Sequence, residues 1–160
     1  MTDITVIPDG SITSPTGFTA GATFAGIKTP GEDKKDLGLL YTEKPANVAG
    51  TFTTNSIVSP SVVLTKGIVN KGGQIKGLAV NSGCANCSVG EQGLIDAKEM
   101  ASISAEKLGT KSEEIVVAST GVIGVELPMA LIRDHIPTLT LDKSGGHELA
   151  KAILTTDTRV

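Results

Sequence analysis

One segment of the chain combines residue types and spacing that suit acyl chemistry. An apolar run at residues 115–117 leads into Ser119-Thr120-Gly121, and a second glycine follows at Gly124. Small hydroxyl and glycine residues at the end of a strand leave O–H and backbone N–H groups accessible, and such groups can hold a developing oxyanion. A tight turn in which glycine only supplies a positive φ has the same composition. The segment alone leaves both interpretations open.

A second segment of the same kind lies upstream. The largely apolar residues 75–81 predict a buried strand, which the polar turn Asn81-Ser82-Gly83 ends. Between the two segments, residues 91–108 repeat apolar side chains on one helical face, and Gly109 is a C-terminal cap. A right-handed crossover through this helix would make the two strands parallel and bring both turns to one edge of a sheet. Such an edge is typical of a small-molecule site.

The remaining elements indicate an α/β domain rich in strands near its N-terminus. Glycine is frequent, with 19 residues, which favours many turns over long regular helices. We expect further strands at residues 4–8, 18–28, 37–42 and 47–54, and helices that begin at Pro60, near Pro128 and near Ser144 or Gly146. Neither repeats nor linkers divide the 160 residues, so we expect one domain.

Composition narrows the classes of function. The net charge is −3 and basic runs are absent, so a nucleic-acid partner is not expected. No apolar stretch approaches the length of about 18 residues that spans a bilayer, and the first residues lack the features of a signal peptide. These observations predict a soluble, cytoplasmic protein that does not bind membranes.

Cys84 and Cys87 form a single C-x-x-C pair, a spacing found in thioredoxin-type redox sites and in half of a zinc site. A second cysteine pair is absent, and His135 and His147 lie outside any ligand spacing. We therefore expect a reduced, mostly buried pair with no metal site and no catalytic role.

Taken together, several motifs resemble the N-terminal part of the ornithine acetyltransferase family. These enzymes are also called glutamate N-acetyltransferases, or the bifunctional ArgJ proteins of arginine biosynthesis. The resemblance covers nearly the whole chain, because the motifs occur in the family's order and at suitable spacings. They are Pro15-Thr16-Gly17-Phe18, Ala25-Gly26-Ile27-Lys28, Asn81–Asn86, Ser119–Gly124, Leu127-Pro128-Met129 and Ala152–Thr158.

The resemblance implies a DmpA/ArgJ-like fold of mixed β-sheets with packed helices, of which residues 1–160 are the N-terminal region of the α chain. It implies transfer of acetyl from N-acetylornithine to glutamate, without a cofactor, through an acetyl-threonine intermediate. Some members also use acetyl-CoA as a donor, and no residue here decides that point. By the same resemblance, Thr120 and Gly121 form the oxyanion hole and Thr155 contacts the amino-acid substrate.

The family also cleaves itself, and the threonine at the new N-terminus is the nucleophile. Its own α-amine acts as the base, so no histidine is needed. In the family, a Lys-Gly-Ser-Gly-Met stretch and the Ala-Thr cleavage junction lie beyond the Thr-Thr-Asp motif, and neither occurs between Thr155-Thr156-Asp157 and residue 160. We therefore expect the nucleophile to come from a C-terminal β chain, in an α₂β₂ assembly, and the isolated chain to be inactive and to expose apolar surface.

The sequence departs from the family pattern after Asn86, where it has Cys87-Ser88-Val89-Gly90 in place of Ala-Cys-Thr-Gly. Two other functions remain open. A related N-terminal-nucleophile amidohydrolase or aminopeptidase would use water as the acceptor, and a ligand-binding module would not need Thr120 for any reaction.

Overall fold

The computed structural model describes residues 4–31 and 33–157 and is built on one four-stranded sheet. The strands lie in the order β1-β2-β3-β4. Their bounds are β1 Phe18–Thr23, β2 Leu37–Asn47, β3 Gln74–Cys84 and β4 Ile115–Val122. The first three strands pair antiparallel, whereas β4 pairs parallel with β3. The sheet is mixed, in agreement with the predicted fold class.

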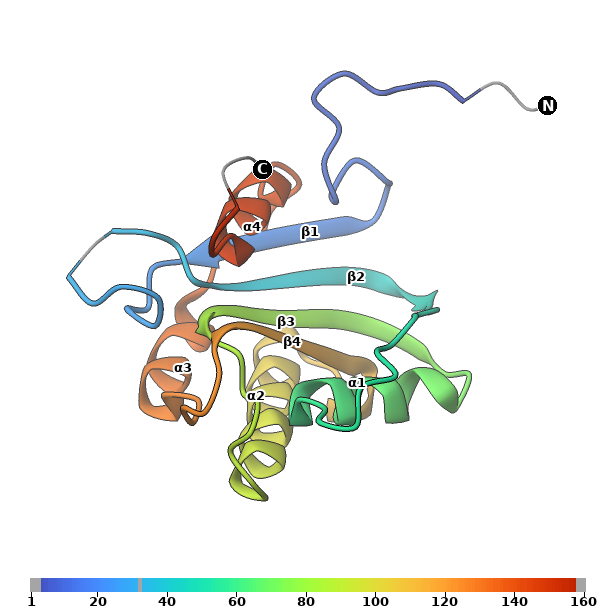
Figure 1. Ribbon diagram of the computed structural model, residues 1–160. Helices are drawn as coiled ribbons and strands as arrows, with labels where there is room; N and C mark the ends of the chain where they lie inside the picture. Colours follow the sequence, from blue (N-terminus) through green and yellow to red (C-terminus); the bar gives the residue numbers. More distant parts are fainter. Residues whose placement is uncertain (1–3, 32, 158–160) are drawn as a thin grey trace.

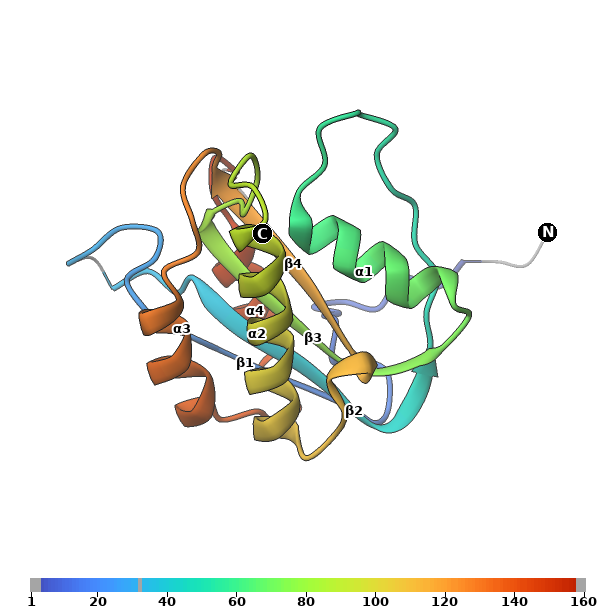
Figure 2. The ribbon, with the colours of Figure 1, turned by 90° about the horizontal axis from the view of Figure 1, so that it is seen from below.

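Helices cover the two faces of the sheet unequally. Three of them lie together on one face and α4 lies alone on the other (Figure 1). Figure 2 shows α3, α2 and α1 side by side across the sheet. The helices are α1 Pro60–Asn70, α2 Gln92–Leu108, α3 Met129–His135 and α4 Gly146–Ile153, with 3₁₀ turns η1 Ser112–Glu114 and η2 Ile136–Thr138. The predicted α/β class is confirmed.

The main hydrophobic core fills the layer between the sheet and the three helices. Strand residues such as Leu39 and Ile115 meet Met100 of α2 and Ile132 of α3, and all four are fully buried. On the opposite face a smaller cluster, including Leu149, lies under α4. The short α4 packs on β1, β2 and β3, so the same face of β4 is left with exposed residues.

The predicted crossover from β3 to β4 is confirmed. Gly77 lies opposite Ile115 and the parallel pairing continues without a break to Cys84 opposite Val122. The connecting helix α2 buries the predicted apolar face, and Gly109 adopts φ +63 as its left-handed C-cap. Two polar segments 38 positions apart in the chain (Ser82 and Thr120) therefore become neighbours.

Two of the predicted strands are wrong. Residues 4–7 form no strand, because Asp142 forms a bridge to Ala20 on the outer edge of β1, so the N-terminal segment does not add to the sheet there. Residues 48–54 also form no strand. Asn47 is paired with Gln74, the first residue of β3, so the chain beyond Asn47 has no neighbouring strand to pair with. In the part of the chain that the structure describes, no helix has both the length and the apolar composition to cross a membrane.

Candidate active site

The candidate site lies where β3 and β4 run side by side toward their C-terminal ends. Ser82 is the register partner of Thr120, and Gly83 is the partner of Gly121. The prediction that the two polar segments meet is therefore confirmed, but the prediction that they are turns is wrong. Both segments are strand, because the parallel pairing continues through them for as long as each has the other as a neighbour.

The outer edge of β4 is covered by α1 along its first half. Thr65 of α1 accepts a hydrogen bond from the Val117 N–H (3.0 Å) and donates one to the Val117 carbonyl (2.7 Å). Two residues further along, the Ser61 and Ser119 hydroxyls lie 2.9 Å apart. Helix α1 begins at Pro60, so its cover stops at this point.

Beyond Ser119 the edge of β4 is open. Backbone groups alternate sides along a strand, and Val117 directs its N–H and carbonyl away from β3. Val122 directs its carbonyl the other way, where it accepts a hydrogen bond from Ala85 N–H (2.9 Å). The Gly121 N–H therefore shares the outward direction of Val117. Among the described residues nothing accepts it outside the strand pairing.

Thr120, the residue before this amide, carries a hydroxyl. Its register partner Ser82 donates to the Ala152 carbonyl of α4 (2.5 Å), so Thr120 points to the α4 face of the sheet. The side chain is half-buried, and its hydroxyl has no hydrogen-bond partner among the described residues. A free hydroxyl and a free backbone N–H on adjacent residues are a pair of donors that can serve a negatively charged oxygen.

Close backbone packing holds this end of β4 in place. Gly121 adopts φ +128, and a Cβ there would lie 2.4 Å from the carbonyl carbon of Gly83. Gly83 adopts φ +103, and a Cβ there would lie 2.5 Å from the Cα of Lys28. Only glycine fits at both positions. The backbone of Gly83 is therefore packed between the backbones of Lys28 and Gly121.

A buried carboxylate holds the backbone of Lys28 in place. Asp36 is fully buried and accepts three backbone hydrogen bonds, from Ala25 (2.7 Å), Ile27 (2.6 Å) and Lys28 (2.9 Å). Burial lowers the pKa of Lys28, while the Asp36 charge opposes that shift. Sequence reasoning identified the Ala25–Lys28 motif but missed Asp36, because no local spacing links a carboxylate to amides eight to eleven residues earlier.

Thr155 lies after α4, on the same face of the sheet as Thr120. It is exposed and lines a polar hollow of about 550 Å³ together with Lys28, Lys151 and Asp157. Its N–H donates to the Asp157 carboxylate (3.3 Å). Thr120 and Gly121 are not among the residues that line this hollow, so Thr155 lies in a separate hollow and not beside these two donors.

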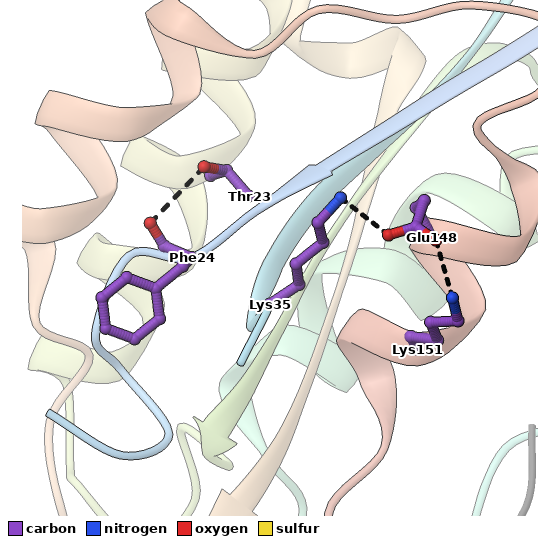
Figure 3. Close-up of polar contacts among 5 residues, drawn as sticks. All are labelled: Thr23, Phe24, Lys35, Glu148 and Lys151. Atoms are coloured by element: carbon purple, nitrogen blue, oxygen red, sulfur yellow. Dashed lines mark hydrogen bonds and ion pairs between the residues drawn. The ribbon is translucent and has the colours of Figure 1, made fainter. Parts of the chain in front are cut away.

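The wall of the hollow contains an ion-pair cluster. Glu148 of α4 receives hydrogen bonds from Lys151 (2.8 Å) and Lys35 (2.7 Å), as Figure 3 shows. These two lysines hold the pKa of Glu148 at about 2. The cluster ties α4 to the loop before β2, which is the loop that Asp36 anchors.

The two cysteines form no disulfide, but they are not the buried pair that was predicted, because Cys87 is partly exposed. Cys84 is buried and donates to the Val125 carbonyl (3.0 Å), and burial raises the pKa of its thiol. A raised pKa disfavours the thiolate that nucleophilic or redox chemistry requires. Among the described residues, no group of three or more histidine, cysteine or acidic side chains is placed to hold a metal.

The arrangement is that of an α/β domain with a pair of hydrogen-bond donors at the open end of a mixed sheet. The profile of the ArgJ family matches residues 19–160, and the chain belongs to the ArgJ family.

Known relatives agree in sequence and in fold. The arginine biosynthesis bifunctional protein ArgJ of Dehalococcoides mccartyi is 43% identical over 159 residues, which are 98% of this chain and 38% of that protein. The crystal structure of the ArgJ protein of Bacillus halodurans superimposes with a TM-score of 0.90 at 37% identity, over 95% of this chain and 79% of that one.

A second solved structure is the ornithine acetyltransferase of Mycobacterium tuberculosis in complex with ornithine. Its TM-score is 0.87 at 34% identity, over 92% of this chain and 80% of that one. The present chain spans well under half the length of its curated relatives.

Proposed function

We propose that this chain is the N-terminal region of the α chain of a cytoplasmic glutamate N-acetyltransferase and supplies its oxyanion hole. The substrates would be N-acetylornithine, with acetyl-CoA as an alternative donor, and glutamate as acceptor. The observation that carries the proposal is the pair of donors at the open end of β4, the Thr120 hydroxyl and the Gly121 N–H. Family membership and the ornithine bound to the Mycobacterium tuberculosis relative support the substrate class.

In the proposed reaction a threonine hydroxyl outside residues 1–160 attacks the acetyl carbonyl of N-acetylornithine. The carbonyl oxygen becomes an oxyanion, which Thr120 and Gly121 stabilise by donating hydrogen bonds. The proton of the attacking hydroxyl passes through the α-amine of the same threonine to the departing ornithine amine, as the C–N bond breaks. Attack by the glutamate amine on the acetyl-threonine ester repeats the same steps and releases N-acetylglutamate.

Thr155 would bind the amino-acid part of the substrates from the neighbouring hollow. Both proposed substrates carry charged groups, and the hollow is lined by polar and charged side chains that include Lys28 and Lys151. Its position on the face of the sheet that Thr120 also faces supports a substrate that reaches from the hollow to the oxyanion pair.

The rest of the enzyme would cover the open end of β4. Val122, Ile123 and Val125 are more than half exposed there, at 59%, 64% and 52%. Exposed apolar side chains in one place mark a contact surface. We propose that a C-terminal β chain carrying the nucleophile packs against it, in the α₂β₂ assembly implied by the family resemblance, and that residues 1–160 alone catalyse no acetyl transfer.

The test is acetyl transfer in the full-length protein that contains this chain, measured with N-acetylornithine labelled in the acetyl group. We expect Thr120→Val to lower kcat by about a hundred- to a thousandfold with little change in KM, because one oxyanion donor is lost. Thr120→Ser keeps the hydroxyl and should retain most of the activity.

The labelled products distinguish a transferase from an amidohydrolase. Label recovered in N-acetylglutamate supports the transferase. Label released only as free acetate would identify an amidohydrolase instead, and full activity in Thr120→Val would remove the oxyanion role.

A further inference from the structure

A chain of buried hydrogen bonds leads to the residue before the oxyanion pair. Asn86 is fully buried, and its side-chain N–H₂ contacts the Ser61 hydroxyl (3.0 Å) and the Gly93 carbonyl (2.9 Å). Ser61, itself 1% exposed, lies 2.9 Å from the Ser119 hydroxyl. The path therefore runs from Asn86 through Ser61 to Ser119, the neighbour of Thr120.

The direction of the first bond is fixed by Gly93. A carbonyl oxygen only accepts, so the group of Asn86 that faces Gly93 must be the N–H₂ and not the amide oxygen. The same N–H₂ then donates its second proton to Ser61. The amide oxygen of Asn86 is left without a partner among the described residues, and a Cβ on residue 93 would lie 2.7 Å from it. Glycine at position 93 is what leaves room for this orientation.

The direction of the second bond follows from burial. Ser61 accepts from Asn86, and the only other partner of its hydroxyl among the described residues is Ser119. If Ser119 donated to Ser61, the Ser61 proton would be buried without an acceptor, at a cost of roughly 1–3 kcal/mol. Ser61 therefore donates to Ser119.

Ser119 consequently keeps its own proton for another acceptor. Its side chain is only partly buried, and no described residue accepts from it. It lies two residues before Gly121, where the cover of α1 ends, on the face of β4 opposite Thr120. The chain of hydrogen bonds leaves a donor at the open edge.

We propose that Ser119 is a third hydrogen-bond donor to the reacting acyl group at this edge, with Ser61 and Asn86 as positioning residues that hold its proton outward. This inference rests on the proposed acyltransferase function. It adds to that function a set of buried hydrogen bonds that fixes the direction of the Ser119 proton. It also assigns a role to the Asn81–Asn86 motif, because its last residue begins this chain of bonds.

The kinetic test uses the full-length protein and labelled N-acetylornithine. Ser119→Ala should lower kcat about ten- to a hundredfold with KM nearly unchanged, the range expected for one hydrogen bond to a charged group. Ser119→Thr keeps the hydroxyl and should restore most of the rate. Ser61→Ala should lower kcat by a smaller factor, roughly three- to tenfold, because Ser119 keeps its proton but loses its fixed orientation.

The double variant shows whether Ser61 acts through Ser119 or whether its loss only damages the structure. Ser61→Ala combined with Ser119→Ala should be no slower than Ser119→Ala alone, because Ser61 acts only through Ser119. Ser104→Ala is the matched control: Ser104 is fully buried and donates to Met100 within α2, so its loss should leave kcat unchanged. A Ser119→Ala variant with wild-type kcat, or rate losses that multiply in the double variant, would overturn the proposal.

Neutron diffraction of the deuterated full-length protein provides a readout that does not depend on catalysis. The proposal requires the Ser61 deuterium to lie on the line to Ser119 and the Ser119 deuterium to point away from Ser61. The reverse orientation would refute the proposal even if the protein is an active transferase. If the wild-type enzyme transfers no acetyl group, the proposed function fails, and the deuterium positions still decide whether the bonds are polarised as inferred.

Discussion

The outer edge of β4 has two stretches, of which the first is covered by a helix and the second is open. At Val117 the edge is covered by α1, whose Thr65 hydroxyl takes the place of a neighbouring strand, and the cover ends where Ser61 contacts the Ser119 side chain. At Gly121 the helix has ended and the backbone N–H has no described acceptor outside the strand pairing. Proteins generally cover or pair their sheet edges. We propose that the first stretch stabilises the fold and that the second is left open for a ligand.

The largest effect should come from filling the space at the open stretch. Gly121→Ala would place a Cβ 2.4 Å from Gly83 at φ +128, and we expect a loss of roughly 3–4 kcal/mol in the free energy of unfolding together with loss of activity. Gly124→Ala is the control. Gly124 also has a positive φ, +83, but has no atom within 4 Å of the new Cβ, so only about 1 kcal/mol should be lost. Urea unfolding of both full-length variants measures the difference, and equal losses would show that packing on Gly83 is unimportant.

Removing the anchor behind the open stretch should have the next largest effect. Asp36→Asn leaves one carbonyl oxygen where a carboxylate now accepts three backbone N–H groups. We expect a loss of roughly 2–3 kcal/mol in stability. Because Lys28 packs on Gly83, a lower kcat should accompany it. Thermal unfolding and acetyl-transfer rates of the same preparation test both parts, and an Asp36→Asn protein as stable as wild type would contradict the anchoring role.

A change in the covered stretch of β4 should lower stability without lowering kcat. Thr65→Val removes the hydroxyl that both donates to and accepts from Val117. We expect a loss of roughly 1–2 kcal/mol in stability with kcat unchanged at a temperature where the variant is folded. A kcat that falls as far as in Thr120→Val would remove the distinction between the two stretches.

The smallest effect concerns the wall of the hollow near Thr155. Glu148 has a pKa of about 2 in the folded protein against 4.5 in the unfolded chain. Its two ion pairs therefore stabilise the fold above pH 4.5, and this contribution is lost as the pH falls from 4.5 toward 2. A carboxyl-carbon NMR titration of Glu148 checks this value, and a pKa near 4.5 would show that the Lys35 and Lys151 pairs do not persist in solution.

Local patterns were sufficient to predict the part of the fold that positions the site. The helical periodicity of residues 91–108 and the Gly109 cap identified α2, and the crossover rule then made β3 and β4 parallel neighbours. The ends of these strands were not predictable in the same way. Asn, Ser, Thr and Gly usually end strands, but here each polar segment has the other as its pairing partner, and pairing across the sheet outweighs local preference.

The hydrogen bonds that distinguish the two stretches of β4 link residues that are far apart in the sequence. Ser61 and Ser119 are 58 residues apart, and Thr65 and Val117 are 52 apart. A single serine or threonine on a helix looks like any solvent-exposed residue in the sequence. The position of Thr155 in a hollow separate from Thr120 was also not predictable, because it depends on how α4 crosses the sheet.

The most direct test of an open, ligand-ready Gly121 amide is NMR of the full-length protein with ¹⁵N-labelled glycine and valine. We predict that the Gly121 N–H exchanges rapidly with solvent in the free protein, and that a tetrahedral phosphonate analogue of the acetyl group slows its exchange and shifts its proton downfield. The Val117 N–H, bonded to Thr65, should be protected in both states. A Gly121 amide that is already protected without ligand, or that does not respond to the analogue, would contradict the account.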